Sequence, residues 1–449
     1  MSDFGFGFGN SPDDSDPDRK RGPEGQGNPF GFGGPGQGGG FDANALGQML
    51  QQFGQMLTNM GQATTGSGSN SPINYDLAKQ LAHQFVGSTP SISAGASSAA
   101  SDSVHLAELW IDEATTFPAG ATRTVAWSPS EWIDGTIDTW KRLCDPVAAQ
   151  INGMWTQNLP AEAQQFAGPV IGIIGQMGGM AFGSQLGQAL AQLSKEILTS
   201  TDIGLPLGPT GVAAVLPGAI SQFAKDIEQP EREVFVFIAA REAAHQRLFH
   251  HVPWLRQRVL ATVEEFARGI KVDTSAIEEL ASGIDPMTMF SDPSKLEEIL
   301  SKGAFEPQTT PEQKATLERL ETLLALVEGW VDTVVKQALG ERLPGVGAMS
   351  ETLRRRRAAG GPAEQTFATL VGLELRPRKL REAAALWQQL TEQRGIEVRD
   401  AVWAHPDLMP DARDLDDPSA FIAHTGVASS DFDEALRKLN EEEPGEEPK

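Results

Sequence analysis

Cysteine is almost absent from this chain of 449 residues, in which Cys144 stands alone. A single cysteine excludes a framework of disulfides within the chain and is typical of a protein from a reducing compartment. A lone cysteine is more often a packing residue than a catalytic thiol. The N-terminal residues also lack a basic region followed by an apolar core, the pattern of a secretion signal. We therefore expect a cytoplasmic protein.

Positive charge is scarce as well. The sequence has 36 Lys and Arg residues against 60 Asp and Glu residues, which gives a net charge of −24. A surface this acidic repels phosphate groups, so the composition argues against nucleic acid as a partner. A glycine-rich phosphate-binding loop is also lacking, because the glycines from Gly168 to Gly187 recur at helical spacing. The sequence therefore does not indicate a nucleotide enzyme.

The two ends of the chain differ in composition from the middle. Residues 1–70 are rich in Gly, Pro and Asp and repeat Phe-Gly pairs, which predicts a disordered leader. Within the leader, apolar residues from Leu46 to Met60 follow helical spacing and predict a short amphipathic helix, folded back on the body or docked on a partner. Residues 436–449 predict an acidic, disordered tail. The folded domain is therefore expected at residues 71–435.

The middle of the chain is predicted to be mainly α-helical. Ser128 and Glu131 form a capping-box pattern around a proline, and Thr310 precedes another proline, so helices are expected to begin there. A loop is predicted for the Ser/Ala/Gly run at 91–103 and a small β element near residues 205–216. The predicted helices cover residues 74–85, 104–115, 129–144, 166–193, 231–249, 311–339 and 377–393, with a last one starting at 419.

Residues 166–193 lack charged side chains and repeat glycine every four residues. Such a run is long enough to cross a membrane. Gln176, Gln185, Gln188 and Gln192 interrupt its apolar character, however, and no aromatic or basic anchors flank it symmetrically. We do not expect a membrane protein. Instead, the run is predicted to form a buried helix packed against the helices that carry the motif described next.

The pentapeptide 241–245 has the pattern RExxH. In the HExxH motif of metalloproteases, two histidines one helical turn apart bind zinc, and the glutamate between them is the general base. Glu242 and His245 match the second and fifth positions of that motif, but Arg241 stands in place of the first histidine. On a helix, Arg241 and His245 share one face. RExxH alone is a weak signal, because these residue types are common on helix surfaces.

A second helix raises the significance of this pentapeptide. Glu328 and Asp332 interrupt an apolar run in the helix predicted at 311–339. A carboxylate inside such a run is costly unless it is paired with a cation or bound to a metal. The two segments together are therefore candidates for one site.

The chain resembles the zincin-like metallopeptidase family of bacterial hydrolases, some of whose members are associated with deazaflavin-coenzyme biosynthesis. The resemblance covers residues 75 to 430, approximately. It rests on the order of three blocks, which are Arg241–Phe249, Leu326–Asp332 and a third that comprises Leu370–Arg376 and continues to Val402–Pro410.

The resemblance implies a mainly α-helical zincin-like fold and a peptide or protein substrate. It makes His245 and Glu328 zinc ligands, Glu242 the base that activates a metal-bound water, and Asp332 a residue that supports a ligand histidine. If active, the protein would be a zinc-dependent metallopeptidase. The first ligand cannot be carried over, because a guanidinium stays protonated and does not bind zinc.

Three interpretations of the altered position follow. In the first, His250 or His251 supplies the missing ligand, which requires the helix to end near Phe249. In the second, Arg241 takes the place of the metal cation and pairs with Glu328 or Glu242, leaving a metal-free pseudo-peptidase. In the third, the residues lie on a surface helix without a shared role.

These interpretations give two hypotheses for function. One is a zincin-family hydrolase whose catalytic competence depends on Arg241. The other is a pseudoenzyme, a helical interaction protein that holds a peptide or protein partner.

Overall fold

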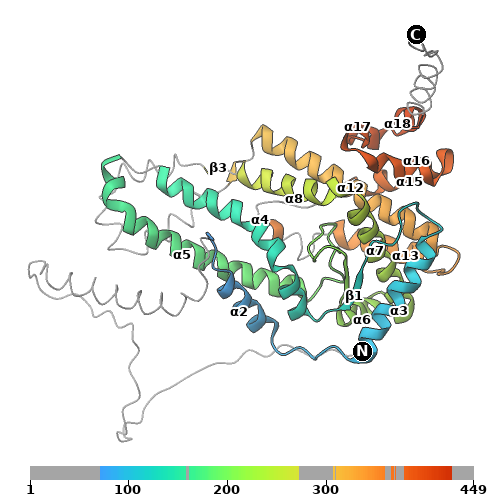
Figure 1. Ribbon diagram of the computed structural model, residues 1–449, viewed down its shortest axis with the longest axis horizontal. Helices are drawn as coiled ribbons and strands as arrows, with labels where there is room; N and C mark the ends of the chain where they lie inside the picture. Colours follow the sequence, from blue (N-terminus) through green and yellow to red (C-terminus); the bar gives the residue numbers. More distant parts are fainter. Residues whose placement is uncertain are drawn as a thin grey trace, which may run out of the picture. The chain divides into compact units, whose positions relative to one another are not determined.

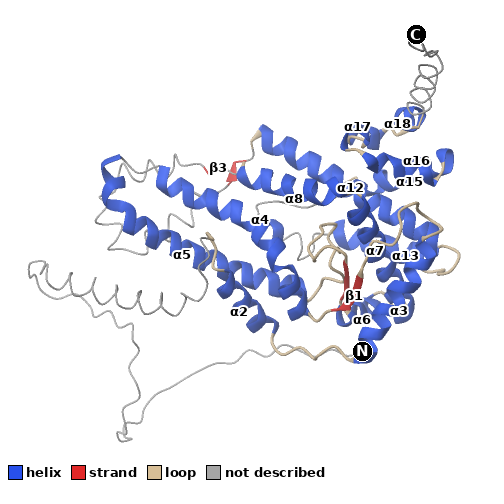
Figure 2. Cartoon of the chain, in the orientation of Figure 1, coloured by secondary structure: helices blue, strands red, loops and turns tan. Residues whose placement is uncertain are grey.

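The computed structural model describes residues 71–157, 161–269, 271–272, 307–308, 310–358, 366–368, 370 and 379–426. The predicted leader, the predicted Leu46–Met60 helix and the predicted acidic tail lie outside these residues. The described chain is mainly helical, as predicted (Figures 1 and 2). Its longer helices are α2 (Tyr75–Val86), α3 (Ala94–Ile111), α4 (Pro129–Gln157), α5 (Ala161–Ser194), α6 (Pro217–Asp226), α7 (Glu231–His251), α8 (Pro253–Arg268), α12 (Pro311–Leu339), α13 (Val346–Ala358) and α15 (Leu380–Arg394).

Shorter helices complete the C-terminal part of the described chain. They are α16 (Ile396–Ala401), the 3-10 turns η1 (Val402–Ala404) and η2 (Pro406–Leu408), α17 (Ala412–Asp416) and α18 (Ser419–His424). The predicted helix starts at Ser128 and Thr310 are confirmed. Glu131 and Ser128 form a reciprocal capping box, and Thr310 forms one with Gln313.

Strands occur in two short pairs within the described residues (Figure 2). β1 (Arg123–Ala126) runs parallel to β2 (Val212–Val215), with Arg123 opposite Val212. β3 (Lys271–Val272) is antiparallel to β4 (Pro307–Gln308). The predicted β element near residues 205–216 is confirmed as β2, whereas no sequence pattern predicts β1. β2 is fully buried and packs on α7, so it borders the helix that carries RExxH.

One predicted loop is a helix. The run at 91–103 is rich in serine and glycine, which favours a loop, but α3 already begins at Ala94. The Ser93 hydroxyl accepts a hydrogen bond from the Ala96 amide and caps that helix. The alanines that follow are strong helix formers, and Ala100 and Ala107 are buried in this helix, which packs on α7. Tertiary packing and the N-cap together outweigh the weak helix propensity of the serines.

The glycine repeat in α5 serves close helix packing. A Cβ at Gly179, Gly183 or Gly187 would come within 3 Å of a backbone oxygen at Pro72, Asn74 or Ala78, so α5 lies against α2 and the residues just before it. The packing partners of α5 are α2 and α4, and the prediction that α5 packs against the motif helices is wrong. Within the described residues, no helix is long and apolar enough to cross a membrane.

The core surrounds α7 and α12. α7 packs against α3, α6, α8, α12 and β2, and α12 packs against α7, α8, α13 and α15. Gly329 of α12 lets α15 approach closely, because a Cβ there would lie 2.7 Å from the Ala384 nitrogen. Cys144 is fully buried, and burial raises the pKa of its thiol, which fits a packing residue rather than a reactive thiolate.

Candidate functional site

α7 is buried along most of its length. The hydrophobic run that opens it lacks Gly and Pro and continues without a break into the RExxH segment. Every residue from Phe237 to Phe249 is buried, so the motif does not lie on a surface helix. The exposed fractions of the site residues are 7% for Arg241, 0% for Glu242, 1% for His245 and 2% for Glu328. Four polar side chains this deep need internal partners.

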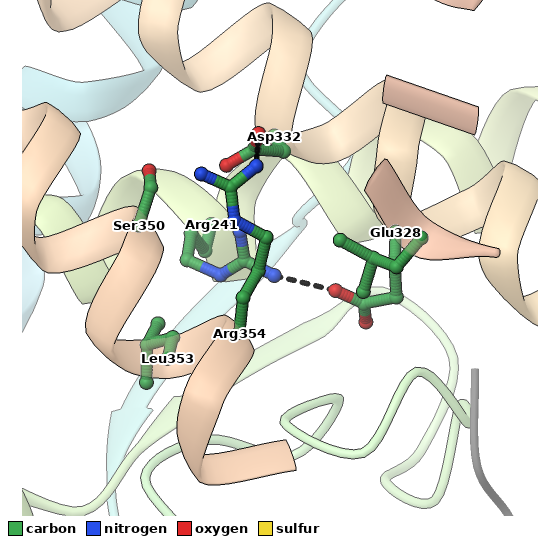
Figure 3. Close-up of a pocket in the computed structure, with 7 residues that line it drawn as sticks. Arg241, Glu328, Asp332, Ser350, Leu353 and Arg354 are labelled. Carbon is green, nitrogen blue, oxygen red and sulfur yellow. Dashed lines mark hydrogen bonds and ion pairs between the residues drawn. The ribbon is translucent and has the colours of Figure 1, made fainter. Parts of the chain in front are cut away.

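Arg241, His245 and Glu328 form one contiguous group, called the Arg241 cluster below. Arg241 Nη2 donates a hydrogen bond to Glu328 Oε2 at 2.5 Å (Figure 3). His245 Nε2 lies 3.0 Å from Glu328 Oε1. The sequence predicts that these three residues from α7 and α12 meet in one site, and the structure places them within hydrogen-bond distance of one another.

The Arg241 cluster fixes the tautomer of His245. His245 Nδ1 lies 2.8 Å from the carbonyl oxygen of Arg241, which can only accept a hydrogen bond, so Nδ1 carries a proton. On the other side of the ring, Nε2 lies 3.0 Å from Glu328 Oε1. The Glu328 carboxylate thus contacts a guanidinium through one oxygen and an imidazole through the other.

Glu242 faces away from this cluster. Its Oε1 accepts hydrogen bonds from Ser200 Oγ at 2.6 Å and from Gln246 Nε2 at 2.9 Å. Its Oε2 accepts from the Thr201 amide at 3.2 Å and the Thr201 hydroxyl at 2.5 Å. A carboxylate offers about four lone-pair positions. Four protein donors therefore satisfy the side chain to which the family resemblance gave the role of base.

Asp332 lies one turn after Glu328 on α12. Its Oδ2 is 2.8 Å from Lys336 Nζ and 3.6 Å from Arg354 Nη1 of α13. The Nδ1 of His245 bonds to the Arg241 carbonyl, so backbone rather than Asp332 orients this imidazole. Arg354 belongs to a run of four arginines at 354–357.

His250 and His251 remain on α7, which ends only after His251. Their rings contact each other with centroids 4.8 Å apart, and the ring of His251 stacks on Phe117. The interpretation in which His250 or His251 supplies the missing ligand requires α7 to end near Phe249. The helix instead continues through both histidines.

The donor set of the Arg241 cluster does not fit zinc. A catalytic zinc site uses three protein ligands, whereas this cluster offers His245 and Glu328 beside a guanidinium that cannot bind a cation. That guanidinium is bonded to the Glu328 carboxylate. Within the described part of the chain, no group of three or more His, Cys, Asp or Glu side chains is placed to hold a metal ion.

Some contacts of the site were not predicted from sequence. Gln246 lies four residues after Glu242 on α7, so helical spacing could have identified it as a partner. Ser200, Thr201 and Gly204 come from a segment about forty residues earlier, where no sequence pattern marks them. Gly204 adopts a φ of +77°, and a Cβ on it would lie 3.1 Å from Glu328 Oε1. This segment therefore packs against both carboxylates.

Comparison with known proteins identifies the family of this chain. The family model described as zincin-like metallopeptidase matches residues 73–422. The chain belongs to the zincin-like metallopeptidase family. A comparison with curated proteins gave no match.

A solved structure supports the fold. The chain is similar to a crystal structure of "a putative hydrolase with a novel fold" from Chloroflexus aurantiacus, with a TM-score of 0.56 and 18% sequence identity. The similarity covers 78% of this chain and 98% of the other. At this identity the similarity concerns the fold.

Proposed function

We propose that this protein is a non-hydrolytic member of its family, a pseudo-peptidase that acts by binding a peptide or protein partner. The bond between Arg241 and Glu328 carries the proposal. A buried carboxylate needs a positive partner, and the guanidinium supplies that charge within the protein itself. In this account Arg241 stands where a metal cation stands in a zinc peptidase, and Glu242 is a structural acceptor.

The access to the site also supports a non-hydrolytic role. The cavity beside Arg241 and Glu328 has a volume of about 10 Å³. Substrate sites are usually clefts of roughly 300–1,000 Å³. A peptide carbonyl could reach this cluster only if the surrounding helices separated.

A larger groove lies on the other side of α12 and is our candidate for the partner site. It lies between α8, α12 and the segment 406–413 and has a volume of about 750 Å³. Trp254, Leu323 and Met409 give it apolar walls, and Arg258 and Glu318 add charge at exposed positions. Apolar anchors beside exposed charges suit an amphipathic peptide segment.

A peptide-library digestion tests the hydrolytic side of this proposal. Purified protein is incubated with mixed peptides and zinc, and the products are identified by mass spectrometry. We expect no cleavage above that of a blank. Cleavage that a chelator stops and that Glu242→Gln abolishes would contradict the proposal and restore the zinc-peptidase alternative.

Partner capture tests the binding side. Partners that copurify with the wild-type chain are expected to remain bound to Glu242→Gln and to be lost from Leu323→Glu, which places a charge in the groove. Leu109→Glu is the matched control, because Leu109 is 52% exposed on α3 and does not line the groove. Equal loss from both leucine variants would contradict the assignment of the groove.

A further inference from the structure

The small cavity beside the Arg241 cluster has polar walls. Arg241 of α7 and Glu328 and Asp332 of α12 line one side, and Ser350, Leu353 and Arg354 of α13 line the other, with the first residue of α15 completing it. Figure 3 shows Arg354 reaching from α13 to Asp332 beside the Arg241–Glu328 bond. The cavity has a volume of about 10 Å³, which corresponds to the space of one water molecule.

Two hydrogen-bond donors of α13 border this cavity without a protein partner. Ser350 is 1% exposed, and its hydroxyl has no hydrogen-bond partner among the described residues. The same holds for Nε of Arg354, one helical turn further on. The two donors share one face of α13, because they are four residues apart.

The Ser350 hydroxyl departs from the usual behaviour of a hydroxyl on a helix. Such groups commonly bond to the carbonyl oxygen one turn earlier. Thr352 on the same helix does so to Ala348, and Thr333 on α12 does so to Gly329. Ser350 makes no such bond while it lines the cavity. An acceptor inside the cavity accounts for this difference.

Cations and carboxylates both surround the cavity. Glu328 is bonded to Arg241, Asp332 contacts Lys336 and Arg354, and Glu351 is contacted by Arg354, Arg355 and Arg381. An occupant must accept hydrogen bonds from the two donors and can donate to the neighbouring carboxylates. A water molecule does both, and a volume of about 10 Å³ suits one water.

We propose that the cavity is a binding site for a single internal water molecule. The water accepts hydrogen bonds from Ser350 Oγ and Arg354 Nε and donates to the carboxylates of Asp332 and Glu328. It thereby joins α13 to the Arg241 cluster. This inference is independent of the proposed function, because it concerns how the buried polar groups are satisfied and not what the protein binds or cleaves.

The direction in which Ser350→Ala changes the melting temperature tests the proposal. With the water bound, Ser350→Ala removes a hydrogen bond, and we expect a lower melting temperature. Without a partner, the buried hydroxyl is itself unfavourable, and its removal would leave the melting temperature unchanged or raise it. Ser194→Ala is the control, because the fully buried Ser194 hydroxyl donates to the Ala191 carbonyl at 3.0 Å. A decrease for Ser194→Ala alone would overturn the proposal.

A crystal structure of the wild-type protein gives a second test that does not depend on any variant folding. We expect one electron-density peak within ordinary hydrogen-bond distance, about 2.6–3.2 Å, of both Ser350 Oγ and Arg354 Nε. Crystals grown with bromide distinguish water from halide, since bromide gives an anomalous signal. A cavity without a peak, or a peak with that signal, would overturn the proposal.

Discussion

The two sides of α7 bury one carboxylate each by different means. Glu328 belongs to α12, and its carboxylate contacts the charged side chain of Arg241 and the titratable side chain of His245. Glu242, on α7 itself, is satisfied by the uncharged donors Ser200, Thr201 and Gln246. Both side chains are almost fully inaccessible.

The difference shows which side of the helix depends on charge. Removing one partner of a buried ion pair leaves an uncompensated charge, whereas removing one of several neutral donors leaves the others in place. The Arg241 side should therefore be the more sensitive to mutation. It is also the side at which the sequence departs from HExxH, and the arginine that stands in place of the first histidine of that motif supplies a counter-charge to Glu328.

Arg241→Met should have the largest effect on stability. It leaves Glu328 buried without its guanidinium, and we expect a loss of about 3–5 kcal/mol in the free energy of unfolding, measured by urea denaturation. Arg319→Met is the control, because Arg319 pairs with Glu265 at 2.6 Å but both side chains are more than half exposed. Its loss should stay near 0–1 kcal/mol. Equal losses for the two variants would contradict the comparison.

Glu242→Gln should lower the free energy of unfolding by less, about 1–3 kcal/mol. In either orientation, the NH₂ group of the glutamine must face two hydrogen-bond donors, which are those of Ser200 and Gln246 or the two of Thr201. The urea midpoint checks this value. An unchanged midpoint would show that the four contacts are not stabilising and would favour a catalytic role for this residue.

Gly204→Ala should lower the free energy of unfolding by about 1–2 kcal/mol, because a residue with a Cβ is strained at a positive φ. The same Cβ would also crowd Glu328 Oε1. Gly218→Ala is the matched control. Gly218 lies in the first turn of α6, where an added Cβ would meet no atom within 4 Å, so alanine there should be neutral or stabilising. Thermal melts of both variants measure the difference.

Glu108 of α3 accepts a hydrogen bond from Arg247 Nε of α7 at 2.5 Å. The pH dependence that this carboxyl gives to stability should be the smallest effect. Burial raises the pKa of Glu108, and the charge and hydrogen bond of Arg247 lower it only in part. The folded state therefore binds the proton more tightly than the unfolded state. This contribution to stability is present below the ordinary pKa of about 4.5 and is lost as the pH rises through the raised value.

Glu108→Gln removes this titration. The difference in unfolding free energy between wild type and Glu108→Gln should shift against the wild type as the pH rises above 4.5. A difference that does not change with pH, or that shifts in favour of the wild type, would contradict the raised pKa. Urea titrations at several pH values provide the measurement.

Helix patterning predicted the part of the site that lies on long helices. Pro311 and Thr310 mark the start of α12, and the uninterrupted apolar run predicts α7, so Arg241, His245 and Glu328 could be assigned to two buried helices. Their order along the chain also carried the family resemblance, which the family match confirms. Local signals sufficed here because caps and helical periodicity act over a few residues.

Contacts made by irregular segments could not be predicted in this way. Ser200, Thr201 and Gly204 reach the carboxylates only because their segment pairs with β2, where the Ser200 amide donates to the Ala214 carbonyl at 3.0 Å. β1 was missed for a similar reason. A four-residue strand with a partner almost ninety residues away has no periodicity of its own.

Zinc content tests the central claim most directly. Protein purified without chelator and then equilibrated with zinc is dialysed, and its metal content is measured by mass spectrometry alongside Arg241→His. We expect no stoichiometric zinc in the wild-type protein and no effect of a chelator on its melting temperature. One zinc per chain, lost on changing His245 to Ala, would contradict the account that Arg241 holds the place of a metal cation.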